Sequence, residues 1–145
     1  QTTPVAHLIF DAVATVSGIA FEDRDLDPEE VGGNVTWEKP AVDDRVFFYR
    51  LYIANSPTGK DRFRVGVEGD IQVGYLSTDV APETALPPQP HLLVYTISEL
   101  VEQTTPAPHN IKDNIASVSN ITFDEFDLDE GDLGGELTWV PPEDN

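Results

Sequence analysis

The strongest strand signal in the chain is the run Val46-Phe47-Phe48-Tyr49-Arg50-Leu51-Tyr52-Ile53. β-branched and aromatic residues are enriched in strands, and side chains two positions apart share a face. Alternation puts Phe47, Tyr49 and Leu51 on one face. The opposite face carries Phe48, Arg50 and Tyr52. Since both faces hold aromatic rings, we expect the second face either to pack under neighbouring loops or to be open to a partner or a glycan.

Further strand patterns lie on both sides of this run. They cover residues 13–21, 34–37, 63–67, 71–75 and 91–97. Twelve prolines and ten glycines leave little room for helices, and only residues 98–102 hint at a helical turn. Short strands about 10 residues apart, without helical partners, are typical of an antiparallel β-sandwich. The sequence therefore predicts an all-β fold.

The chain repeats itself at a shift of 102 residues. The first four residues, Gln1-Thr2-Thr3-Pro4, recur as Gln103-Thr104-Thr105-Pro106. The segment Gly32-Gly33-Asn34-Val35-Thr36-Trp37 recurs as Gly134-Gly135-Glu136-Leu137-Thr138-Trp139. Of the 43 aligned pairs, 20 are identical. A period of this length is too long for a solenoid and matches one immunoglobulin-like sandwich.

The repeat predicts how the chain is divided. Residues 1–12 are expected to be the last strand of a preceding repeat, and residues 13–112 a complete domain. Residues 113–145 are then the first two strands of the next repeat. Two strands cannot bury their apolar face alone. We therefore expect either a covalent tandem array or exchange of strands between chains.

Several motifs resemble those of fibronectin type III domains. The segments Trp37-Glu38-Lys39-Pro40 and Trp139-Val140-Pro141-Pro142 resemble the W-x-x-P that closes the second strand of that family. The run at 49–53 resembles the following strand, and Leu86-Pro87-Pro88 resembles the late Leu-x-Pro turn. The family's corner tyrosine is replaced by Leu92, so the resemblance implies the sandwich and leaves its subtype open. It implies a spacer, adhesion or accessory module whose core contains Phe21, Val35, Trp37, Leu51, Leu92 and Val94, with Trp139 in the next repeat.

Composition narrows the class of partner. With 8 basic and 27 acidic residues the formal charge is −19, which repels nucleic acids and anionic membranes. The chain contains no cysteine, which excludes disulfides and cysteine catalysis. Residues 65–145 carry one basic and 16 acidic side chains. This surface suits a medium rich in salt or calcium, or it simply keeps the protein soluble.

Two acidic segments are candidates for Ca²⁺ binding. Each follows the first strand of its repeat, and carboxylate oxygens are ligands that Ca²⁺ prefers. The candidate ligands are Asp23, Asp25, Asp27, Asp127, Asp129 and Asp132. The spacing is not that of an EF-hand, and a solvated acidic loop is the competing interpretation. No other cofactor is expected.

Glycosylation is a second hypothesis. Asn34 and Asn120 each begin an N-x-[ST] sequon, which makes them candidates for N-linked glycans. The hydroxyls of Thr2, Thr3, Thr104 and Thr105 are candidates for O-linked glycans. Stiff polar linker ends are the alternative interpretation of the threonine pairs.

These features together predict a structural role. No nucleophile elbow, P-loop or His-Glu-x-x-His motif occurs, so we expect no enzyme. The sequence predicts an extracellular or cell-surface repeat that builds a fibre, stalk or adhesin. Its partners are then copies of itself or adjacent repeats of the same chain, with glycans as a further possibility and no membrane insertion. The alternative is a carbohydrate-binding or accessory module that uses exposed aromatic side chains.

Overall fold

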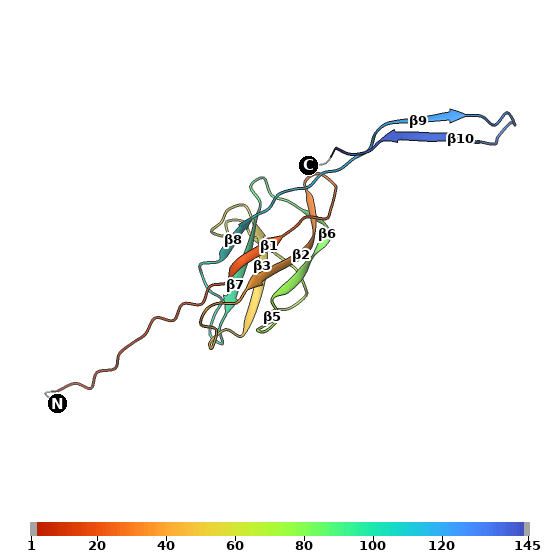
Figure 1. Ribbon diagram of the computed structural model, residues 1–145. Helices are drawn as coiled ribbons and strands as arrows, with labels where there is room; N and C mark the ends of the chain where they lie inside the picture. Colours follow the sequence, from red (N-terminus) through yellow and green to blue (C-terminus); the bar gives the residue numbers. More distant parts are fainter. Residues whose placement is uncertain (1–2, 144–145) are drawn as a thin grey trace.

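The computed structural model describes residues 3–143, and these residues form strands and loops without a helix. The ten strands occur in chain order (Figure 1). They are β1 (Ser17–Phe21), β2 (Glu30–Glu38), β3 (Phe48–Ala54), β4 (Phe63–Val65), β5 (Ile71–Gln72), β6 (Ser77–Ala85), β7 (His91–Ile97), β8 (Ala107–Asn110), β9 (Ser119–Glu125) and β10 (Gly135–Val140). The all-β, antiparallel class predicted from the sequence is confirmed.

Two sheets face each other across a shared core. The first has the order β1-β2-β6 and the second the order β4-β3-β7-β8, with β5 also paired to β3. The pairings are antiparallel. The longest register joins β3 to β7, from Phe48 opposite Ile97 to Ala54 opposite His91. This arrangement is consistent with a β-sandwich.

The core lies between β2 and β6 on one side and β3 and β7 on the other. Trp37 is 3% exposed, and its ring meets Tyr49 edge-on with centroids 5.5 Å apart. The other core positions named from the sequence, Val35, Leu51, Leu92 and Val94, are fully buried, and Phe21 is partly buried against them. An aromatic ring buried in this way stabilises the fold by several kcal/mol. The inward alternation of Tyr49 and Leu51 follows the sequence pattern.

The longest strand that the sequence pattern missed is β6. It spans nine residues and contains Pro82, which sequence analysis reads as a turn former. Proline is tolerated because β6 is an edge strand of its sheet, where a missing N–H breaks no inner ladder. Inward-facing Thr78 and Val80 alternate with exposed neighbours. This alternation is the sequence signal that could have predicted the strand. Residues 98–102, expected to hint at a helical turn, form a bend closed by Ser98 N donating to Val101 O.

Steric crowding explains why two glycines occur together at positions 32 and 33 of β2. A Cβ on Gly32 would lie 2.7 Å from Pro82 Cα, and one on Gly33 would lie 2.6 Å from the Glu22 carbonyl oxygen. Only glycine permits this close approach of β2 to its neighbours. The pairing register shifts between Val31 and Gly33, so the pair marks a β-bulge.

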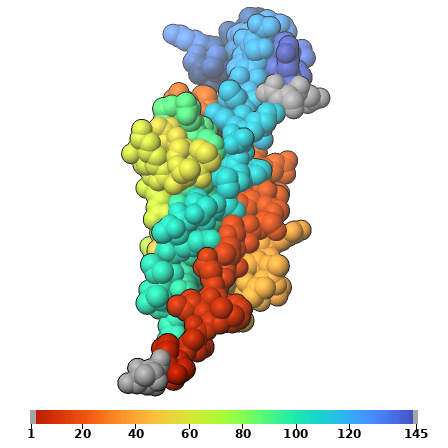
Figure 2. All heavy atoms as spheres, turned by 90° about the vertical axis from the view of Figure 1, so that its left-hand side faces the viewer, coloured from red at the N-terminus to blue at the C-terminus, as the bar shows by residue number. Residues whose placement is uncertain are grey.

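The two ends of the chain leave the sandwich at opposite poles. Residues 4–16 carry no strand. Residues 4–13 are exposed and lead away from one pole, whereas β9 and β10 form a hairpin beyond the other (Figures 1 and 2). The hairpin is a separate two-stranded sheet. Among residues 3–143 no further strand pairs with this hairpin.

Candidate functional site

The β9–β10 hairpin reproduces the β1–β2 pair at a shift of 102 residues. Phe21 lies opposite Val35 in the first pair, and Phe123 lies opposite Leu137 in the second. An unusual backbone dihedral also recurs: Gly18 and Asn120 both have a φ between 50° and 60°. A Cβ on Gly135 would collide with the Asp124 carbonyl, as one on Gly33 would with that of Glu22. The two segments therefore share local structure as well as sequence.

One face of the hairpin is apolar and open. Leu137 and Phe123 are opposite each other, so side chains two positions away share their face. The exposed apolar side chains of that face are Ile121, Phe123, Leu137 and Trp139. The opposite face is polar, with the Thr122 and Thr138 hydroxyls 2.8 Å apart.

Trp139 departs from the core position expected for it. It is 54% exposed, whereas its counterpart Trp37 is buried against Tyr49. The reason is that the hairpin has no second sheet to pack against among residues 3–143. The apolar face is the largest difference between the two equivalent strand pairs.

Asp23 forms a clamp of hydrogen bonds with backbone N–H groups. Its side chain is buried in the β1–β2 loop, which we define as residues 22–29. Oδ1 accepts hydrogen bonds from Gly32 N at 3.0 Å and Asp25 N at 3.1 Å, and Oδ2 accepts from Asn114 N at 2.9 Å. Asp23 lies outside the acidic cluster described below. Glu125, at the equivalent place, accepts from Asp127 N and Gly134 N in the same way.

The exit segment, residues 113–116, is fastened to the same loop. The Asn114 side-chain amide donates to the Asp23 carbonyl at 2.9 Å, and Glu29 N donates to Asp113 Oδ2 at 2.8 Å. Ala116 N donates to the Leu26 carbonyl at 3.2 Å. Sequence analysis did not identify this junction, since hydrogen bonds between residues about 90 positions apart leave no local pattern.

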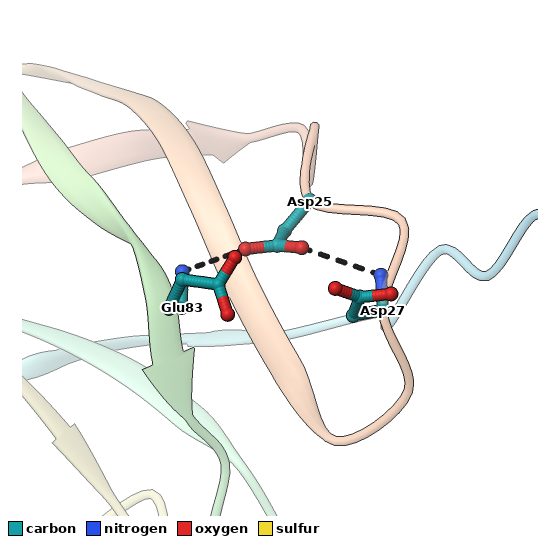
Figure 3. A group of neighbouring side chains, drawn as sticks. All are labelled: Asp25, Asp27 and Glu83. Carbon is teal, nitrogen blue, oxygen red and sulfur yellow. Dashed lines mark hydrogen bonds between the residues drawn. The ribbon is translucent and has the colours of Figure 1, made fainter.

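Asp25 and Asp27 do come together, and Glu83 of β6 joins them (Figure 3). One carboxylate oxygen from each lies within 4.8 Å of the others. Asp25 Oδ2 accepts from Glu83 N at 2.7 Å and Oδ1 from Asp27 N at 3.3 Å. The first of these backbone donors, then the second, lowers the pKa of Asp25. The pKa of Glu30 is raised because it shares a hydrogen bond with Glu83 and is repelled by that carboxylate.

The calcium hypothesis stays a prediction. The cluster of Asp25, Asp27 and Glu83 offers oxygen ligands of the type that Ca²⁺ prefers. Within residues 3–143 the second acidic segment forms no matching cluster, because no strand equivalent to β6 stands beside Asp127, Asp129 and Asp132. Asp127 Oδ1 instead accepts from Asp129 N, and Asp132 N donates to the Asp129 carbonyl.

The outer face of β3 is covered by other parts of the domain. The Arg62 guanidinium lies 4.4 Å from the ring centroids of both Tyr52 and Tyr95. Glu102 accepts from Tyr52 Oη at 2.9 Å and forms ion pairs with Arg50 and Arg62. Bidentate hydrogen bonds from Arg50 lower the pKa of Asp70. Of the aromatic side chains expected to offer a platform for sugars, Tyr52 is therefore engaged within the domain, whereas Phe47 and Tyr75 are 46% and 67% exposed.

The candidate glycosylation sites lie in different settings. Asn34 is exposed, but its amide donates to Asp79 Oδ1 at 2.8 Å. Asn120 is exposed in β9. Thr3, Thr104 and Thr105 are exposed, and Thr2 lies outside the described residues. Glycosylation stays a prediction.

A groove opens at the pole where the N-terminal segment enters, and we call it the N-terminal groove. Its volume is about 610 Å³. Its lining comes from three parts of the chain: Ala12 and Ala14, then residues 44–47, then residues 96–101 with Gln103. Leu100 on its rim is 90% exposed. The groove and the exit segment thus occupy opposite ends of the domain.

Comparison of the chain with protein-family models, with curated proteins and with solved structures finds no match. Along the part of the chain that the structure describes, no helix has the length and apolar character needed to cross a membrane.

Proposed function

We propose that this chain is part of a structural repeat protein in which fibronectin type III-like β-sandwiches of 102 residues follow one another. The array would act as an extracellular fibre, stalk or adhesin. The observation that carries the proposal is the β9–β10 hairpin. It has the register of β1–β2, and its exposed side chains are the counterparts of side chains that the complete domain buries fully (Val35, Trp37) or partly (Ile19, Phe21).

A covalent array explains the hairpin better than exchange between chains does. Completing the hairpin requires strands equivalent to β3–β7. In a second copy of this chain those strands are already covered by its own β1 and β2. An incoming hairpin would have to displace an equivalent pair and would gain no buried area. The strands that complete it are therefore expected from the following part of the same polypeptide.

The carbohydrate-binding alternative has less support. It needs a group of aromatic rings that are free to stack on sugars. Arg62 covers Tyr52 and Tyr95, so that Phe47 and Tyr75 are the exposed rings left from the expected set. Arg62 is itself held by Glu102 at 2.8 Å. A sugar would have to displace an ion-paired guanidinium from both rings, which costs more than stacking on an open ring.

The proposal is tested with a longer chain, which we call the two-repeat chain. It consists of residues 1–145 followed directly by a second copy of residues 44–114, because Asn145 is equivalent to Asp43. The chain then has two tryptophans, and Trp37→Phe leaves Trp139 as the sole reporter. We expect the emission of Trp139 to shift to shorter wavelength relative to the same variant of the 145-residue chain.

Amide hydrogen exchange of the unsubstituted two-repeat chain provides a second readout that needs no substitution. Residues 119–140 should gain protection close to that of residues 17–38. Unchanged exchange and an unshifted Trp139 emission would both contradict the tandem-domain proposal.

A further inference from the structure

Two segments of this chain, one at each pole, are equivalent under the repeat. The exit segment 113–116 follows the domain, and residues 11–14 precede it at a distance of 102 positions. Asp11 corresponds to Asp113 and Ala14 to Ala116. What the structure shows at each pole can therefore be combined into one junction between successive repeats.

At the exit, the chain holds the β1–β2 loop beside it. Hydrogen bonds join Asp113 to Glu29 N, and Asn114 to Asp23. The last of the series, from Ala116 N to the Leu26 carbonyl, places the loop's apolar residue next to the start of the following repeat. Leu26 is 52% exposed there, flanked by Asp25 and Asp27. A leucine side chain that stays exposed to water contributes no hydrophobic free energy to the stability of the single domain.

At the entrance, the residue equivalent to Ala116 lines the N-terminal groove. Ala14 is held in place because Thr96 Oγ1 donates to its carbonyl at 2.7 Å. Beside it the lining offers the apolar side chains of Val46, Phe47, Ile97 and Leu100. The groove therefore begins at the position to which a preceding repeat would fasten its β1–β2 loop.

We infer that Leu26 of each repeat inserts into the N-terminal groove of the repeat that follows. The inference rests on the proposed function, since it requires that repeats follow one another in one chain. The occupant is the β1–β2 loop because Ala116 N bonds to Leu26, and Ala14, the equivalent of Ala116, forms the groove wall. The junction is then closed by hydrogen bonds to the exit segment and by one apolar plug. Successive repeats are held at a fixed angle.

Charge contributes less than the apolar contact. Within the described lining Arg45 is the basic side chain, and it faces a loop that carries Asp25 and Asp27. Asp44 and Glu99 belong to the same lining and oppose that attraction. We therefore assign the affinity of the loop for the groove to the apolar contact of Leu26. Arg45 offsets part of the repulsion between the acidic groups of the loop and those of the groove.

The chain offers a matched pair of variants for the test. Leu128 is the equivalent of Leu26 in the second β1–β2 type loop, and in the two-repeat chain no repeat follows it. We would compare Leu26→Gln with Leu128→Gln in that chain, by ¹⁵N relaxation of both repeats and by small-angle X-ray scattering. We expect the unsubstituted chain and Leu128→Gln to tumble as one elongated body. Leu26→Gln should lower the rotational correlation time of each repeat toward that of the 145-residue chain.

Disulfide trapping gives a second readout, because the chain has no cysteine. Leu26→Cys is paired with a cysteine at the position equivalent to Val101 in the second repeat. A disulfide forms readily only when the two Cα atoms come within about 7 Å. We expect cross-linking within one chain for Leu26→Cys, and none for Leu128→Cys with the same partner. A cross-link between two chains would place a second copy in the groove and overturn the inference.

Failure of this inference is distinguishable from failure of the proposed function. If Trp139 remains exposed in the two-repeat chain, the second domain has not formed and the tandem proposal is wrong. If Trp139 is buried while Leu26→Gln behaves like Leu128→Gln, the array stands and the plugged junction is wrong.

Discussion

Neighbouring aspartates of the β1–β2 loop lie in different surroundings. Asp23 and Asp25 are two positions apart, yet Asp23 is buried and saturated by backbone donors while Asp25 faces Asp27 and Glu83. The sequence pattern treats these aspartates alike, since it records spacing and charge. What distinguishes them is contact with residues 83 and 114, which is set by the fold.

The Asp23 clamp yields the first prediction. Asp23→Ala removes an acceptor that three backbone N–H groups share and leaves buried donors without a partner. Hydrogen bonds to a charged group are worth about 1.5–3 kcal/mol each, and we expect a total loss of about 3 kcal/mol because the effects overlap. Urea unfolding measures it. Glu22→Ala removes the same charge from an exposed neighbour and should change the free energy of unfolding by less than about 0.5 kcal/mol. Equal effects of the two variants would argue against the clamp.

The second prediction concerns pH. The pKa of Glu30 is raised in the folded state, so folding favours its protonated form. Its contribution to stability is therefore present below its ordinary value of 4.5 and is lost as pH rises through the raised value. The pKa of Asp70 is lowered by Arg50, so its contribution is present above 3.8 and is lost as pH falls through the lowered value.

Stability should consequently reach its maximum at mildly acidic pH rather than at neutral pH. Thermal melts from about pH 3 to about pH 8 check this. Glu83→Gln, which removes the main cause of the Glu30 shift, should reduce the decline toward neutral pH. Asp70→Asn should reduce the decline at acid pH. A melting temperature that rises steadily up to neutral pH in the unsubstituted chain would refute the assignment to Glu30.

At the scale of elements, equal sequence does not guarantee equal burial. β2 and β10 share a Gly, a Thr and a Trp at equivalent positions, and both pair with the preceding strand in the same register. Trp37 is nevertheless buried and Trp139 exposed, because β3 and β7 stand opposite the first pair only. Intrinsic strand preference therefore fixes the hairpin, while burial depends on what packs against it.

The pair of tryptophans provides the third prediction. Trp37→Ala should lower the free energy of unfolding of the 145-residue chain by about 3–5 kcal/mol, since it empties a space beside Tyr49. Trp139→Ala should lower it by less than about 0.5 kcal/mol, because the ring has little to pack on. Chemical denaturation followed by tyrosine fluorescence and circular dichroism measures both variants in the same way. A large loss in Trp139→Ala would mean that the hairpin is packed in solution.

Sequence reasoning succeeded where the strand pattern is continuous and failed where the backbone is irregular. The bounds of β7 match the expected 91–97, because a largely apolar run that is buried from Leu92 to Ile97 ends at turn formers. β6 was missed because Pro82 and the positive φ of Glu83 interrupt its pattern. The same irregularity brings Glu83 to Asp25, so the sequence identified two of the three residues of the acidic cluster. The exit-segment contacts and the N-terminal groove join residues that lie far apart in the sequence, so a local sequence pattern could not predict them.

For the whole molecule, two opposing properties decide how the chain associates. The net charge of −19 keeps copies apart, and the apolar face of the β9–β10 hairpin draws them together. Which property prevails depends on salt. The Debye length falls from about 30 Å at 0.01 M to about 3 Å at 1 M ionic strength, so repulsion between chains is removed while apolar contact remains.

The fourth prediction follows from this balance. The 145-residue chain should be monomeric at low salt and should self-associate at about 1 M salt, as measured by sedimentation velocity. Trp139→Ser should weaken that association strongly because it removes the largest side chain of the apolar face. Leu100→Ser, which alters the N-terminal groove, should leave it unchanged. Association that is lost in Leu100→Ser and kept in Trp139→Ser would mean that copies meet through the groove. In the two-repeat chain the hairpin face is covered by its own following strands, so the salt-dependent association should disappear although the chain carries more negative charge and more surface.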